Sequence, residues 1–123
     1  MLYVPTLFVR ERYISAGLDE GEERVMDIDK MQQQADHAVV LLKALANERR
    51  LFILCHLLNE GEMCVGEMNK KLGLSQSALS QHLAWLRKDN LVCTRKEAQT
   101  VFYSLKSNEV KELIQVLNNM YCY

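Results

Sequence analysis

Short polar side chains recur along residues 76–89 in a pattern that suits contact with nucleic acid. Leu79, Leu83 and Leu86 stand at i, i+4 and i+7, so a helix over this segment would bury one leucine face. Its other faces would carry small amide and hydroxyl residues, namely Gln76, Ser77, Ser80 and Gln81. Such groups hydrogen-bond to base edges and to phosphates, and glutamine suits adenine. The segment, with Ser75 as its cap, is therefore a candidate base-reading helix, and the alternative is an ordinary exposed helix.

Basic residues surround this candidate helix. Residues 70–106 hold seven Lys and Arg against two acidic residues, a local charge of +5, whereas residues 1–69 carry −5. Charge alone is compatible with a polyanion partner such as double-stranded DNA and equally with a solvated surface, so the helix pattern decides for DNA. The expected phosphate contacts are Lys70, Lys71, Arg87, Lys88, Arg95 and Lys96. Gln99 and Thr100 stand where the tip of a hairpin would meet a groove.

Four cysteines are the other residues that could do chemistry. In the cytosol they are expected as thiols, and if all four paired, three connectivities would be open. Cys55 lies in an apolar run and Cys122 near a helix C-terminus, and both settings raise a thiol pKa. Taken alone, these residues indicate a buried packing thiol and a terminal one. Cys93 is expected in a strand and Cys64 beside a loop.

The hydrophobic pattern predicts the elements that position these residues. The expected order is a helix over 31–46, a helix capped by Asn47, a short helix over 65–72 ended by Gly73, the reading helix, two strands in LVCTRK and VFYSL, and a last helix capped by Ser107. This order is mainly α with a small β-hairpin, a winged helix-turn-helix. The stretch AVVLLKALA is apolar on nearly every side, so the domain is expected to dimerise through its N- and C-terminal helices.

Length and composition limit the alternatives. The chain has 123 residues, 49% hydrophobic and 25% charged, which predicts one soluble domain over 31–123. Residues 1–30 form an acidic extension, either mobile or a short accessory helix. No apolar run approaches the roughly 20 residues of a membrane span, and no signal peptide is recognised, so a cytoplasmic protein is expected. The sequence shows no group of acid, base and nucleophile residues, which argues against an enzyme. No cofactor is expected either.

Three segments resemble the ArsR/SmtB family of bacterial repressors: LKALANERRLFILCHL, VGEMNKKLGLSQSALSQHLAWLRKDNLV and RKEAQTVFYSL. The resemblance covers about three quarters of the chain and is greatest to the HlyU/BigR/SqrR branch. It implies a homodimer that binds operator DNA when reduced. In that branch two cysteines sense sulfide-derived persulfides, and the matching positions are Cys55 and Cys122. The resemblance therefore implies a repressor that is released by reactive sulfur or an oxidant through a Cys55–Cys122 dithiol switch.

Three other functions remain open at this point. Metal-sensing relatives carry a Cys-x-Cys pair where this chain has Cys64 and Gly66, and the last helix has no His, so no metal site is expected. A metal-responsive repressor is therefore a minor alternative. The second alternative is an anti-silencing activator with the same fold. The third is a module whose apolar terminal helices bind another protein.

Overall fold

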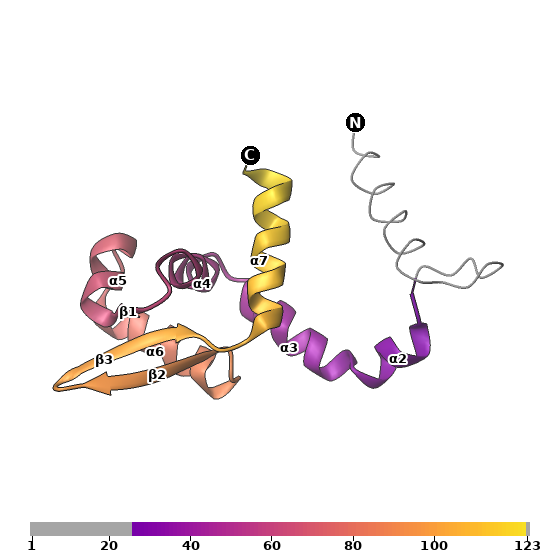
Figure 1. Ribbon diagram of the computed structural model, residues 1–123, viewed down its shortest axis with the longest axis horizontal. Coiled ribbons are helices and arrows are strands. Elements are labelled where there is room, and N and C mark those ends of the chain that lie inside the picture. Colours follow the sequence, from indigo (N-terminus) through magenta and orange to yellow (C-terminus); the bar gives the residue numbers. More distant parts are fainter. Residues whose placement is uncertain (1–25, 123) are drawn as a thin grey trace. The chain divides into compact units, whose positions relative to one another are not determined.

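The computed structural model describes residues 26–122, so most of the predicted extension over 1–30 lies outside the described residues. The elements are α2 (Ile28–Gln33), α3 (Ala35–Leu45), α4 (Glu48–Glu60), β1 (Met63–Cys64), α5 (Val65–Leu72), α6 (Gln76–Lys88), β2 (Val92–Glu97), β3 (Thr100–Leu105) and α7 (Asn108–Tyr121) (Figure 1). The chain divides into two compact units, with the boundary between Asp36 and His37. The helix predicted over 31–46 is in fact two helices, because the chain leaves helical geometry at Gln34.

Helix ends follow the predicted capping signals. The side chains of Asn47, Ser75 and Ser107 each accept a hydrogen bond from a backbone N–H three residues later, which satisfies one of the free donors at a helix start. Gly73 adopts a left-handed φ of 67° and ends α5. It leaves only a short turn before α6, so α5 and α6 form the helix-turn-helix that the sequence predicts.

The sheet has one strand more than predicted. Its order is β1-β3-β2, with all pairs antiparallel, and Tyr103 of β3 lies opposite Met63 on one side and Thr94 on the other. The β2–β3 hairpin turns at Ala98 and Gln99, and Ala98 takes a positive φ of 56°. Figure 1 shows this hairpin reaching away from the helices, which is the geometry of a wing.

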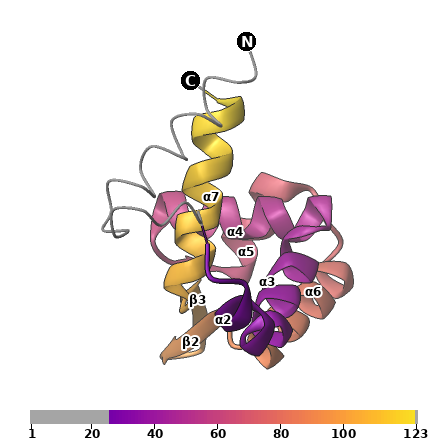
Figure 2. The ribbon, with the colours of Figure 1, turned by 90° about the vertical axis from the view of Figure 1, so that its right-hand side faces the viewer.

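The core of the second unit is made by the apolar faces of its helices and the base of the sheet. Leu79, Leu83 and Leu86 of α6 are all buried, which confirms the predicted leucine face. Helix α4 contacts both α5 and α7, and Figures 1 and 2 show it between them. The result is the predicted mainly helical winged helix-turn-helix. None of the described helices is long and apolar enough to cross a membrane.

The two helices predicted to dimerise keep apolar residues on their surfaces. In α3 only Ala44 is buried, while Leu42 is 56% exposed and Val39 is 45% exposed. Val116 and Met120 of α7 are half exposed or more. Large apolar side chains in such numbers on two helices favour a covering partner.

Candidate DNA-binding surface and cysteine pocket

The predicted reading residues all lie on the exposed side of the helix-turn-helix. Ser75, Gln76, Ser77, Ser80 and Gln81 are exposed, and the leucine face of α6 points the other way. The Ser75 hydroxyl is partly engaged, because it accepts from the Ala78 N–H at 3.1 Å and lies 3.5 Å from the Ser77 hydroxyl. The amides of Gln76 and Gln81 therefore remain the longest groups on this surface that could meet a base edge.

A basic hollow separates the reading helix from the wing. It has a volume of about 470 Å³ and is lined by Ser80, Ala84, Arg87, Lys88 and Tyr103. The lining offers two cations, a serine hydroxyl and a tyrosine, and it contains no acidic residue. Such a surface is suited to a phosphate group. The sequence predicted Arg87 and Lys88 here but missed Tyr103, because that residue reads as an ordinary aromatic strand position and joins the hollow only through the sheet.

Arg95, a predicted phosphate contact on β2, is held by two carboxylates. Its Nε and Nη2 donate to Glu62 at 2.7 and 2.8 Å, and its Nη1 donates to Glu97 at 2.9 Å. The guanidinium also lies 4.6 Å from the centre of the Phe102 ring. These hydrogen bonds raise the pKa of Arg95 and lower that of Glu62. Of the two cations that the sequence predicted for the wing, Arg95 is thus balanced on the protein itself.

The remaining predicted contacts are at the ends of this surface. Lys96, Gln99 and Thr100 are exposed at the outer end of the hairpin. Lys70 and Lys71 are exposed on α5, and the Lys71 ammonium lies 3.3 Å from a carboxylate oxygen of Glu60. The structure therefore brings the α6 residues together with the hollow, and places the hairpin tip apart from them.

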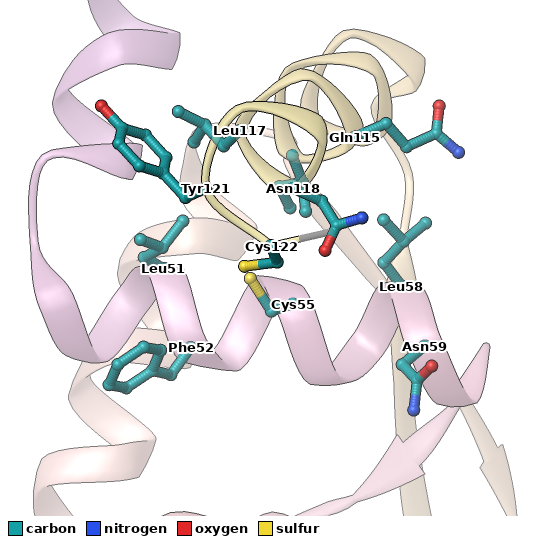
Figure 3. A pocket seen from close by; sticks show the side chains of 11 residues that line it. Leu51, Phe52, Cys55, Leu58, Asn59, Gln115, Leu117, Asn118, Tyr121 and Cys122 are labelled. Carbon is teal, nitrogen blue, oxygen red and sulfur yellow. The ribbon is translucent and has the colours of Figure 1, made fainter.

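Cys55 and Cys122 meet in a pocket between α4 and α7. Figure 3 shows their sulfur atoms pointing toward one another, Cys55 from the middle of α4 and Cys122 from the residue after α7. Both are free thiols, Cys55 half-buried and Cys122 exposed. The pocket has a volume of about 440 Å³ and is lined by Leu51, Phe52, Cys55, Leu58, Asn59, Ile114, Gln115, Leu117, Asn118, Tyr121 and Cys122.

The surroundings of Cys55 oppose its ionisation. Burial raises the pKa of the Cys55 thiol, and the neighbouring Cys122 raises it further. The residues that line the pocket include no Lys, Arg, His, Asp or Glu. The prediction of a raised pKa at Cys55 is confirmed, and no cation in this lining stabilises a thiolate.

The other two cysteines lie outside this lining. Cys93 is exposed on β2, with its sulfur 3.4 Å from the Ser104 hydroxyl. Cys64 precedes α5, and its N–H donates to the Glu67 carboxylate at 2.9 Å. Among the described residues no three His, Cys, Asp or Glu side chains gather in a way that could hold a metal ion.

Comparison with known proteins identifies the same module. Residues 47–94 match the family of bacterial regulatory proteins called the arsR family. The chain is 63% identical to the transcriptional activator HlyU of Vibrio cholerae over 97 residues, which cover 79% of this chain and 89% of that protein. It is 38% identical to the biofilm growth-associated repressor of Agrobacterium fabrum, with 93% of this chain and 94% of that protein covered.

Solved structures agree with these relatives. The transcriptional repressor BigR from Xylella fastidiosa superposes with a TM-score of 0.74 at 35% identity, over 80% of this chain and 99% of that one. HlyU from Vibrio cholerae superposes with a TM-score of 0.71 at 64% identity, over 76% of this chain and all of that one. The relatives are transcriptional regulators, and the chain is accordingly a regulator rather than an enzyme. This chain belongs to the ArsR family of winged helix-turn-helix regulators and is closely related to HlyU and BigR.

Proposed function

We propose that the protein is a homodimeric repressor that binds operator DNA when reduced and leaves it when Cys55 and Cys122 become linked. The observation that carries the proposal is the pair of free thiols facing one another across the pocket between α4 and α7 (Figure 3). The two helices belong to different layers of the fold, since α4 leads to the helix-turn-helix and α7 ends the chain. A link between them constrains the DNA-binding module without touching a DNA contact.

The DNA partner is supported by the exposed face of α6 and the basic hollow beside it. The Gln and Ser side chains near the start of α6 would enter a major groove. Arg87 and Lys88, at the end of the same helix, would contact the DNA phosphate backbone. Lys96, Gln99 and Thr100 would reach the neighbouring groove from the hairpin tip. Two copies of the module predict a near-palindromic operator with half-sites about one helical turn, roughly 34–36 Å, apart. Such a protein acts in the bacterial cytoplasm, where the chromosome lies.

Dimerisation is supported by the exposed apolar residues of α3 and α7. Val39, Val40 and Leu42 of α3 and Val116 and Met120 of α7 are each at least 40% exposed. A self-complementary patch formed by these helices would bury them in a second copy. The distance between the two reading helices would then depend on how α4 and α7 are placed in each protomer.

The sensing step can be written with its atoms balanced. An organic persulfide transfers its outer sulfur to the Cys55 thiolate, giving a Cys55 persulfide and the free organic thiol. The Cys122 thiolate then attacks the Cys55 sulfur and expels hydrogen sulfide, which leaves a disulfide. If Cys122 first accepts a sulfur as well, the two persulfides condense to a trisulfide and one hydrogen sulfide. The persulfide is reduced to its thiol while the two cysteines are oxidised.

The test measures operator binding and linkage on the same samples. Purified protein is reduced, or treated with an organic persulfide or with peroxide, and then assayed by DNA binding and by non-reducing peptide mass mapping. Cys55→Ser and Cys122→Ser should bind as tightly as the reduced wild type and should not respond, whereas Cys93→Ser, outside the pocket, should respond normally. Operator release by persulfide-treated Cys55→Ser protein would show that the mechanism is wrong.

An activating role is a second candidate, favoured by the 63% identity to a protein named a transcriptional activator. An ArsR-type regulator can activate by displacing a silencing nucleoid protein from DNA. Transcription from a target promoter in vitro, with and without a nucleoid protein, separates the two roles. Activation that needs the nucleoid protein supports anti-silencing, and repression of the naked promoter supports the repressor.

A further inference from the structure

Arg50, in the first turn of α4, contacts two other helices through one side chain. Its Nε donates to the carbonyl oxygen of Ala44 at 3.2 Å, and its Nη2 donates to that of Lys43 at 3.0 Å. The flat face of the guanidinium lies 3.8 Å from the centre of the Trp85 ring on α6. One residue therefore joins the end of α3, the start of α4 and the reading helix.

These contacts depend on the shape of the arginine side chain. The last carbonyl groups of a helix have no partners within the helix, and Arg50 satisfies two of them at the end of α3. A guanidinium can donate in its own plane and stack on an aromatic ring at the same time, whereas a lysine ammonium cannot. The charge of Arg50 also acts on other residues at α6: burial lowers the pKa of His82 and Arg50 lowers it further, while burial lowers the pKa of Arg50 and Asp89 opposes that shift.

Arg50 is also next to the cysteine pocket. It directly precedes Leu51 and Phe52, which line that pocket, and Cys55 follows on the same uninterrupted helix. A helix of this length moves largely as a rigid rod over one or two turns. Any change in how α4 lies against α7 must therefore move the guanidinium, and with it the partners on α3 and α6.

On the other side of this junction is the DNA surface. Trp85 lies on α6 between Gln81 and Lys88 and is half-buried against the core, so together with the buried leucines its indole contributes to setting the rotation of the helix. A change in that rotation moves the exposed Gln and Ser side chains against the groove. Base contacts distinguish operator from other DNA and phosphate contacts do not, so a loss of base contacts lowers the affinity for operator alone.

We propose that Arg50 is a positioning residue that holds the reading helix against the corner of α3 and α4, and that carries the state of the Cys55–Cys122 pocket to the DNA surface. The second half of this statement rests on the function proposed above, whereas the first half does not. The two halves therefore need separate measurements.

The first measurement concerns the reduced protein. Arg50→Lys keeps the charge but loses the pair of hydrogen bonds to α3 and the stacking on Trp85. We therefore expect operator affinity to fall by about 2- to 30-fold while affinity for non-operator DNA stays unchanged. Arg49→Lys, at the exposed neighbouring position, is the matched control and should equal the wild type. A purely structural defect would lower both affinities and the melting temperature together. Equal operator affinity for Arg50→Lys and the wild type would overturn the positioning role.

The second measurement uses Trp85 as a probe, since it is the only tryptophan in the chain. Linking Cys55 to Cys122, verified by peptide mapping, should change Trp85 emission and lower operator affinity in the wild type. In Arg50→Lys both responses should shrink although the link still forms. Undiminished responses in that variant would overturn the transmitting role.

Two further outcomes are also decisive. If the linked wild type binds operator as well as the reduced form, the proposed function fails and the transmitting role fails with it, while the first measurement still decides positioning. If Arg50→Lys does not fold, Trp85→Leu replaces it, because this change removes the stacking and leaves the hydrogen bonds of Arg50 to α3. Operator affinity is again compared with affinity for non-operator DNA. Loss of operator affinity alone supports the proposal, and unchanged operator affinity contradicts it.

Discussion

Replacing Glu62 by Gln should strengthen DNA binding and make it more sensitive to salt. Glu62 is bound to the Arg95 guanidinium through two hydrogen bonds of 2.7 and 2.8 Å. Glutamine has nearly the same size but no charge, so Arg95 becomes free to exchange this partner for a DNA phosphate. Glu97 still holds one edge of the guanidinium, at 2.9 Å, and leaves the Nε edge available.

The size of the effect follows from the number of phosphates contacted. One additional neutralised phosphate steepens the dependence of log affinity on log salt by about 0.9. Between about 50 and about 200 mM salt, a slope change of that size corresponds to an additional loss of about 3.5-fold. The variant should therefore bind more tightly than the wild type at low salt, and its advantage should shrink by about 3.5-fold across this range.

The assay is fluorescence anisotropy with labelled operator DNA at several salt concentrations. Glu112→Gln, an exposed position on α7, makes the same change in net charge away from the wing and should run parallel to the wild type. Adding Arg95→Gln to Glu62→Gln should abolish the gain. Equal salt slopes for Glu62→Gln and the wild type would refute the reasoning, because Arg95 would then not reach a phosphate even when released.

Three other predictions concern reactivity, stability and assembly. Because burial raises the pKa of Cys55, its thiolate is the minor form at neutral pH. The rate of Cys55 alkylation, followed by peptide mass, should therefore rise about 100-fold between about pH 6.5 and 8.5. A plateau within that range would contradict the raised pKa. Leu83→Ala, at a position 1% exposed, should cost about 2.7–5 kcal/mol in the free energy of unfolding measured by denaturant titration, and a cost below about 1 kcal/mol would mean that α6 is not packed as described. Leu42→Glu, on α3, should give a monomer by light scattering, and a persistent dimer would place the interface elsewhere.

The helices could be predicted from sequence because their signals are local. A cap three residues from a free N–H, or leucines spaced by one helical turn, depend only on residues within the element. The break at Gln34 was missed because no Gly or Pro marks it. Strand β1 was missed for the opposite reason, since its two residues are a strand only by pairing with Phe102 and Tyr103 far along the chain.

The cysteine pair depends on tertiary packing in the same way. From local surroundings Cys55 is a packing thiol and Cys122 a terminal one, and only the family resemblance joined them. The pocket supplies the physical link, because it brings the middle of α4 and the end of α7 to one place. It does not supply a cation to activate either thiol. The reactivity proposed for Cys55 therefore depends on the nearby second thiol, and not on a lowered pKa or on exposure, since Cys122 is the more exposed of the two.

The charge of the DNA-binding region shows how far such tertiary pairs alter a sequence-based inference. The window 70–106 has a charge of +5, but Lys71 is paired with Glu60 and Arg95 with Glu62, and both acids lie outside that window. The positive potential presented to DNA is therefore weaker than the window suggests, and it is concentrated near Arg87 and Lys88 at the end of the reading helix. Glu62 directly precedes β1 and binds the Arg95 guanidinium of β2, so it competes with phosphate for this residue of the wing. A phosphate contact by Arg95 would have to break that ion pair first, whereas Lys96 at the hairpin tip is exposed. We therefore expect the α6 surface to be the main anchor and the wing to be an adjustable second contact.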